Sequence, residues 1–92
     1  MSESPIWPVE TGAFIADTMH LTCEETAAYA LLMMHIWRDG LGQKTLPFDH
    51  KRLARMARVS PKRWKKIWTS IEDFFVIDSK AGEIRALGRE IQ

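Results

Sequence analysis

The sequence predicts a mainly α-helical domain with one small β-hairpin. Two capped helix starts, Asp49 and Ser60, stand eleven residues apart, which leaves room for a helix of about two and a half turns and a bend. An apolar helix precedes this pair, and the segment that follows it alternates as strand, turn and strand. A helix, a short strand, two helices and a hairpin, in this order, are the elements of a winged helix-turn-helix.

Length and composition indicate a single globular domain. The chain has 92 residues, of which 46% are hydrophobic and 27% are charged, as in ordinary folded proteins. Its one cysteine excludes an intramolecular disulfide, and no apolar run reaches about 18 residues, so we expect a cytoplasmic protein. We expect residues 1–20 to form an N-terminal arm that packs on a winged helix-turn-helix domain of residues 21–92.

The N-terminal segment is rich in proline and aromatic residues. Two prolines flank Trp7 and disfavour a regular helix, so residues 1–12 are expected to be extended and to lay Trp7 onto the domain. Residues 13–18 are predicted to form a short helix or turn, with Phe14 and Ile15 directed inward.

The apolar helix begins at a capping box, Thr22 with Glu25. It is predicted to run to about Asp39 and to stop at Gly40. This helix is apolar almost all round, so its surface must be covered. Either the N-terminal arm and the hairpin (the wing) cover it, or one of its faces forms an interface in a homodimer or with another protein. The residues predicted for such a partner interface are Tyr29, Met33, Met34 and Trp37.

Each helix of the predicted pair has its own start signals. Asp49 caps the first helix, and Ser60 caps the second helix, which has Pro61 at its first position. The second helix should extend to about Asp73. Its apolar residues recur at helical spacing and should face the core; they are Trp64, Ile67, Trp68, Ile71, Phe74 and Phe75.

Three segments are predicted to be strands. Residues 45–48 are short and extended, before the helix pair. Residues 75–77 and 83–87 are joined by a turn over residues 78–82, which is the pattern of a hairpin.

Basic residues are concentrated around the helix pair. Between Lys44 and Lys66 there are nine basic residues and one acid, whereas residues 1–43 contain one basic residue and six acids. Cations in the first turn of the second helix are repelled by the positive end of its macrodipole and destabilise the helix. A function other than helix stability therefore explains them best. Binding of a phosphate backbone is such a function; the alternative is a solvated face, partly neutralised by the acidic first half.

Double-stranded DNA is therefore the predicted partner. The second helix is expected to lie in the major groove, with Lys62, Arg63, Lys66 and Ser70 nearest the DNA, and the first helix and turn are expected to hold phosphates. The complete predicted DNA-binding set is Lys51, Arg52, Arg55, Arg58, Lys62, Arg63, Lys65, Lys66 and Ser70.

The sequence predicts no enzyme, and therefore no catalytic residue, metal or cofactor. His20 and Cys23 have the spacing of half a metal site, but no second pair follows. The segment Gly40-Leu41-Gly42 lacks the further glycine and lysine of a phosphate-binding loop. His35, within the apolar helix, is interpreted as a core or interface histidine.

Four segments carry a resemblance to a known family. They are residues 12–18 (GAFIADT), residues 21–29 (LTCEETAAY), Trp37 and residues 52–66 (RLARMARVSPKRWKK). With these segments the chain resembles the YdaU / DUF1376 family of small phage and prophage proteins. The resemblance implies a winged-helix fold and DNA binding in phage replication initiation or its regulation.

The chain departs from the family pattern in the hairpin turn. Family members usually carry a basic wing, whereas here Asp78 and Glu83 stand beside Lys80 and Arg85. A rival hypothesis is a protein-interaction module that binds a host or phage protein through the basic face and the apolar helix.

Overall fold

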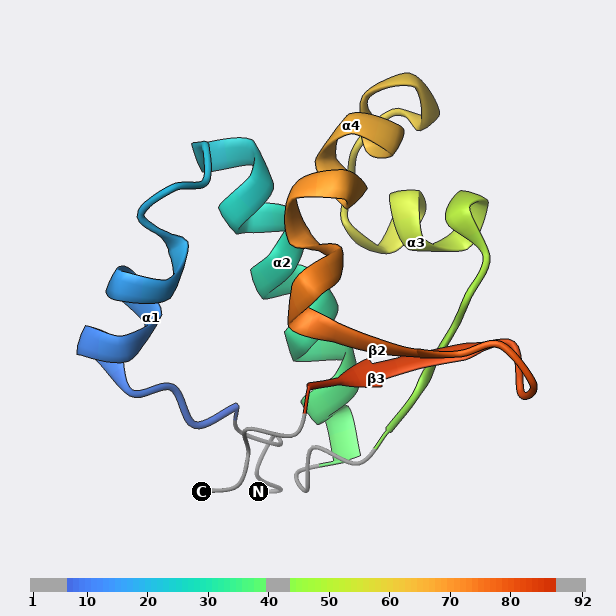
Figure 1. Ribbon diagram of the computed structural model, residues 1–92, viewed down its shortest axis with the longest axis horizontal. Coiled ribbons are helices and arrows are strands. Elements are labelled where there is room, and N and C mark those ends of the chain that lie inside the picture. The colour runs from blue at the N-terminus through green and yellow to red at the C-terminus, as the bar shows by residue number, and fades with distance from the viewer. Residues whose placement is uncertain (1–6, 40–43, 88–92) are drawn as a thin grey trace, which may run out of the picture.

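Helices form most of the structure, which is a computed structural model that describes residues 7–39 and 44–87 (Figure 1). Within these residues there are four α-helices and one antiparallel sheet of three short strands. In chain order the elements are α1 (Thr11–Thr18), α2 (Cys23–Ile36), β1 (Leu46–Pro47), α3 (His50–Met56), α4 (Pro61–Ile71), β2 (Phe75–Asp78) and β3 (Glu83–Ala86).

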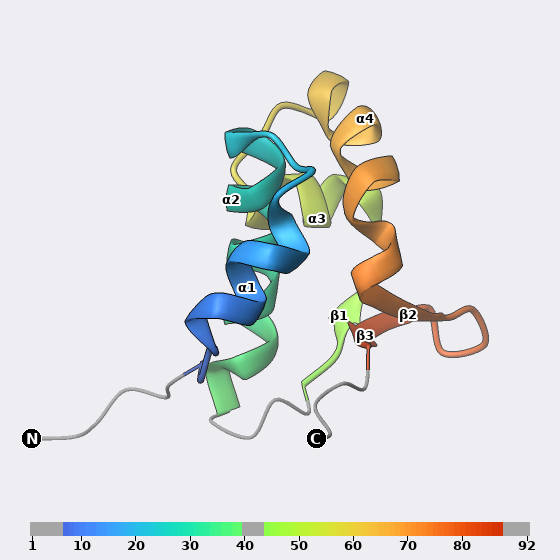
Figure 2. The same cartoon turned by 60° about the vertical axis from the view of Figure 1, so that its left-hand side comes forward.

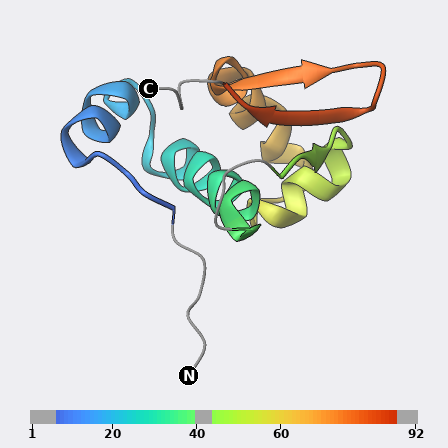
Figure 3. The ribbon, with the colours of Figure 1, turned by 90° about the horizontal axis from the view of Figure 1, so that it is seen from below.

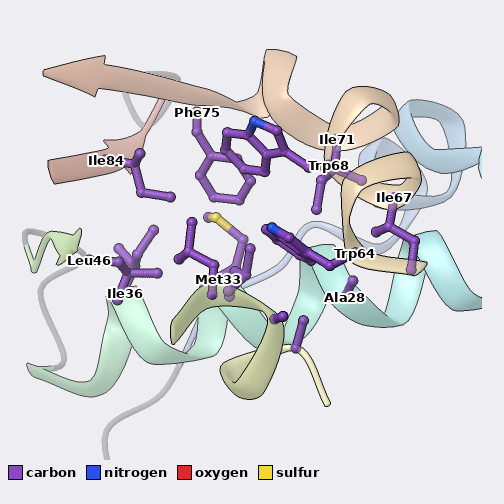
Figure 4. Packing of buried hydrophobic residues seen from close by; sticks show 14 residues of the cluster. Ala28, Met33, Ile36, Leu46, Trp64, Ile67, Trp68, Ile71, Phe75 and Ile84 are labelled. Carbon is purple, nitrogen blue, oxygen red and sulfur yellow. The ribbon is translucent and has the colours of Figure 1, made fainter. Parts of the chain in front are cut away.

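The core lies between α2, α3, α4 and the sheet. In Figure 4 the side chains of Trp64 and Phe75 point toward Met33 of α2, and Trp64 is only 1% exposed. Leu53 of α3 is also fully buried. The predicted apolar stripe of α4 is therefore confirmed as a core face. The buried hydrophobic residues are Ala28, Leu32, Met33, Ile36, Leu46, Leu53, Ala54, Ala57, Trp64, Ile67, Trp68, Ile71, Phe75 and Ile84.

The sheet has the strand order β1-β3-β2, with β3 in the centre. Ile84 of β3 is paired with Leu46 of β1 on one side and with Ile77 of β2 on the other. Pro47 lies on the edge strand, where its missing N–H removes no ladder bond. The β2–β3 hairpin projects from the helical part of the molecule (Figure 2). Gly82 closes its turn with φ of +67°, a conformation that glycine adopts without steric cost.

The predicted helix starts are confirmed. Thr22 and Glu25 form the reciprocal capping box of α2. The Asp49 carboxylate accepts hydrogen bonds from the Lys51 and Arg52 amides at the start of α3. Ser60 Oγ accepts a hydrogen bond from the amide of Arg63 at the start of α4.

Both long helices end sooner than predicted. α2 ends at Ile36 and continues as a 3₁₀ turn, Trp37–Asp39. α4 ends at Ile71 and is followed by a 3₁₀ turn, Glu72–Phe74. Such tightening supplies hydrogen bonds to the last carbonyls of a helix. Gly40, the predicted stop of α2, lies outside the described residues.

The N-terminal region differs from the prediction in two respects. The extended segment reaches only to Glu10, because its carboxylate accepts hydrogen bonds from the Gly12 and Ala13 amides and so starts α1 at Thr11. Ile15 is 57% exposed, so its predicted inward orientation is wrong. It lies about 100° around the helix from Phe14, which turns inward.

Trp7 does pack against the domain, as predicted. Its ring meets Phe14 and Tyr29 edge-on, with ring centroids 5.9 Å and 6.3 Å away. Helix α1 consequently lies on one side of α2, while α3 lies on the other side (Figure 3).

Candidate nucleic-acid interface

The outward face of α4 is basic. Trp64, Ile67, Trp68 and Ile71 occupy the buried face, and helical spacing therefore places Lys62, Lys65, Lys66 and Thr69 on the opposite side. All four of these side chains are exposed. The structure thus brings three of the predicted DNA-binding lysines onto one solvent-facing stripe.

One flank of α4 is already occupied by carboxylates of α2. Arg63 Nη2 lies 2.7 Å from Glu24 Oε1, and Arg63 Nε donates to the same oxygen at 3.2 Å. This hydrogen bond and the glutamate charge raise the pKa of the Arg63 guanidinium. Arg63 and Ser70, both predicted to be nearest the DNA, lie on this flank and not on the outward stripe.

Ser70 is held by the capping box of α2. Its hydroxyl donates to Glu25 Oε2 at 2.8 Å, while Glu25 Oε1 accepts a hydrogen bond from the Thr22 amide. The hydrogen bond from the Thr22 amide contributes most to keeping the pKa of the Glu25 carboxyl below its ordinary value of 4.5, and the bond from the Ser70 hydroxyl contributes next. The charge of Lys66 lowers this pKa further, although Lys66 forms no salt bridge with Glu25 among the described residues.

Helix α3 contributes a second group of exposed cations. Lys51, Arg52 and Arg55 are all exposed, while Leu53 and Ala54 between them are buried. Arg52 Nε lies 3.9 Å from Asp49 Oδ2. This separation permits only a weak interaction between exposed groups.

Arg58 stands at a strained position between the two helices. Its amide donates to Arg55 O at 3.1 Å, and the Val59 amide donates to Ala54 O at 3.0 Å, the pair of bonds found in a Schellman motif. The motif requires a left-handed residue, and Arg58 has φ of 62°. Glycine usually occupies this position, so a long basic side chain here is unusual.

A further bond joins α3 and α4. The buried indole N–H of Trp64 donates to His50 Nδ1 at 3.0 Å. This bond was not predicted from the sequence. Neutralisation of basic residues by the acidic first half was given as an alternative, and Glu24 with Arg63 is such a pair, but the sequence did not identify these two residues. The two bonds join residues 14 and 39 positions apart, and no local spacing signals such pairs.

Three of the four residues predicted as a partner interface, Tyr29, Met33 and Trp37, line one groove, and Met34 does not. Met33 is buried, and Tyr29 and Trp37 are half-buried. The ring of Tyr29 stacks on Phe74 at 4.4 Å. Met34, in contrast, is 51% exposed.

His35 is half-buried, as expected for a residue of the core or of an interface. Burial, and then the charges of Arg38 and Arg58, lower the pKa of its imidazole. Within residues 7–39 and 44–87, no three His, Cys, Asp or Glu side chains are grouped as metal ligands. In the same part of the chain, none of the helices has the length and hydrophobicity needed to cross a membrane.

Comparison with known proteins identifies a family. A family model described as "Protein of unknown function (DUF1376)" matches residues 5–85. The chain is 37% identical over 75 residues to "Uncharacterized protein YdaU" of Escherichia coli strain K12. This match covers 82% of the chain but only 25% of that relative, so the chain spans about a quarter of its length. No solved structure matches the chain. The family model matches most of the chain, including every helix described above. The chain therefore belongs to the DUF1376 family.

Proposed function

We propose that this chain is a non-enzymatic winged helix-turn-helix module that binds double-stranded DNA through α3, α4 and the turn between them. The observation that carries the proposal is the set of exposed cations on these adjacent elements: Lys51, Arg52, Arg55, Arg58, Lys62, Lys65 and Lys66. The positions of Lys62 and Lys65 near the start of α4 are costly, because the N-terminal end of a helix is already positive. A phosphate backbone offsets that cost by releasing its condensed counterions when the cations bind.

The order of the elements supports the winged-helix assignment. Helix α2, strand β1, the α3–α4 pair and the β2–β3 hairpin follow one another as in that class. Helix α4 is its second helix, the one that enters the major groove in helix-turn-helix proteins. We place Lys62 and Lys66 nearest the DNA and assign Lys51, Arg55 and Arg58 to phosphates.

Arg63 and Ser70 have a different role in this proposal. Both are bound to carboxylates of α2, so they orient α4 on the domain in the free protein. Because Glu24 occupies Nε and Nη2 of Arg63, we expect Arg63 to contribute less to phosphate binding than Lys62 and Lys66. The biological step that we propose, from the family resemblance, is replication initiation or its regulation.

The decisive experiment is a salt titration of DNA binding by two matched double variants. Lys62→Gln/Lys66→Gln removes two outward cations of α4, and Arg38→Gln/Lys44→Gln removes two exposed cations outside α3 and α4. We expect fluorescence anisotropy with a 30-base-pair duplex to show that the slope of log K against log salt becomes shallower by about 1.8 in the first variant. The second variant should keep a slope close to that of the parent chain.

Equal slopes in the two variants would remove α4 from the interface. Absence of duplex binding at about 50 mM salt, where binding of cations to phosphates is strong, would favour the rival proposal. The rival is a protein-interaction module that uses the basic face and the apolar helix. Light scattering in the same buffers distinguishes a monomer from a homodimer, whose two α4 helices would span half-sites about 34 Å apart.

A further inference from the structure

A groove with an aromatic floor lies on the side of α2 where α1 is found. It has a volume of about 750 Å³, within the range of known ligand sites. It is bounded by the extended segment before α1, by α1 and α2, and by the 3₁₀ turn that follows α4. The aromatic residues that line it are Trp7, Phe14, Tyr29, Trp37 and Phe74.

The charged residues of this groove are acidic. Glu10, Asp17 and Asp73 line it, and no lysine or arginine does so among residues 7–39 and 44–87. Glu10 is engaged in capping α1. Asp17 and Asp73 are exposed and form no salt bridge with any described residue. Two carboxylates are therefore available beside an apolar floor, with His20 near them.

The groove and the basic stripe lie on different faces of α4, because Ser70 lines the groove and Lys62, Lys65 and Lys66 do not. Helices α1 and α3 are on opposite sides of the α2–α4 pair (Figures 1 and 3). A ligand in the groove would leave Lys62 and Lys66 open to solvent, so occupation of the groove does not compete with DNA. This second site does not depend on whether the basic face binds DNA.

The chemistry of the groove excludes some ligands and favours others. Phosphates are repelled by Asp17 and Asp73. A second copy of this chain offers cations on α4, but the outward stripe there carries no apolar side chain to fill an aromatic floor. A cation beside aromatic rings and carboxylates gains both ion-pair and cation–π attraction, and a bulky apolar anchor gains most when it fills a pocket.

We propose that the groove binds a basic segment of a partner protein, in which one bulky apolar residue is flanked by lysine or arginine. The apolar anchor lies over the floor formed by Phe14, Trp37 and Phe74, and the flanking cations pair with Asp17 and Asp73. Val9, which is 40% exposed and lines the groove, contacts the anchor from the side of α1.

The probe is a set of fluorescein-labelled 12-residue peptides in three series. The first has Trp, Phe or Leu flanked by two Lys or Arg on each side; the second has the same anchors flanked by Glu; the third has Ala flanked by Lys. We expect the first series to bind, with affinity that falls as salt rises, and the third to bind about tenfold more weakly. The second series should not bind.

Two variants separate the groove from general charge effects. Asp17→Asn/Asp73→Asn should weaken binding of the first series about tenfold. The matched control Asp78→Asn/Glu83→Gln makes the same change in net charge on the hairpin and should change binding by less than about twofold. Val9→Arg, which places a cation in the groove, should also weaken binding while the far-ultraviolet circular dichroism is unchanged.

Three results would overturn the proposal. The first is equal binding of the Lys-flanked and Glu-flanked series, and the second is equal binding by the groove variant and the hairpin variant. The third is self-association of the parent chain that Asp17→Asn/Asp73→Asn abolishes, because it would identify a second copy as the occupant. Anisotropy with the DNA duplex tests the other face separately: the groove and hairpin variants should bind DNA alike.

Discussion

Replacement of Arg58 by glycine should stabilise the fold and weaken DNA binding at the same time. Arg58 has φ of 62°, and a left-handed conformation costs a non-glycine residue about 1–2 kcal/mol. Glycine avoids this strain but loses more backbone entropy on folding, about 0.5–1 kcal/mol. The difference is a gain of roughly 0.5–1 kcal/mol, which corresponds to a rise in Tm of about 2–8 °C for a domain of this size.

The same substitution removes one cation from the turn between α3 and α4. If Arg58 holds a phosphate, the slope of log K against log salt should become shallower by about 0.9. Thermal unfolding followed by circular dichroism measures the first effect, and anisotropy with the duplex measures the second. Arg58→Lys is the control, because it keeps both the charge and the strained backbone and should change neither quantity much.

The two readouts test two separate statements. A lower Tm for Arg58→Gly would refute the argument that the Schellman position is strained by arginine. An unchanged salt slope would show that the side chain does not meet DNA, and the strain would then have no functional explanation. If the Tm rises and the salt slope becomes shallower, Arg58 lowers the stability of the fold while it supplies a cation to the interface. Backbone strain is retained in this way at other functional sites.

Three further predictions concern bonds made by side chains. His50→Ala should lower the free energy of unfolding in urea by about 1–2 kcal/mol, because the buried Trp64 N–H loses its acceptor; His50→Asn, which retains an acceptor near the Nδ1 position, should restore most of it. Glu24→Gln should release Arg63 and tighten duplex binding about two- to fivefold at low salt, and weaker binding would show instead that Glu24 orients Arg63 for DNA. Folding lowers the pKa of Glu25, so the stabilisation from its carboxylate is full above pH 4.5 and is lost as the pH falls through the lowered value. In Glu25→Gln the difference between the Tm at pH 7 and the Tm at pH 3 should therefore be smaller than in the parent chain.

The features that could be predicted from the sequence depend on residues close together in the chain. The caps at Thr22, Asp49 and Ser60 bond to amides two or three positions away, so a short motif contains the whole interaction. The buried stripe of α4 follows from a helical period over eleven residues. The hairpin follows from two short apolar runs on either side of a turn that contains Gly82.

The features that were missed depend on contacts between distant elements. Arg63 and Lys62 are adjacent cations in the sequence, yet only Arg63 faces Glu24, because the orientation of α4 on α2 determines which flank meets the carboxylates. Ile15 is apolar, like Phe14, but α1 presents only one narrow face to the domain. Local propensity contains no information about such packing, which the tertiary structure decides.

The capping box of α2 therefore has a second role, in the placement of α4. One oxygen of Glu25 satisfies the Thr22 amide, and the other accepts the hydroxyl proton of Ser70 on α4. The preceding residue, Glu24, binds Arg63. Two successive carboxylates of α2 therefore contact α4 at positions about two helical turns apart. These two contacts add to the buried apolar face of α4, which sets the rotation of the helix about its axis and directs Lys62, Lys65 and Lys66 away from the domain. The acidic start of α2 thus neutralises only one flank of α4 and leaves its outward stripe available to a polyanion.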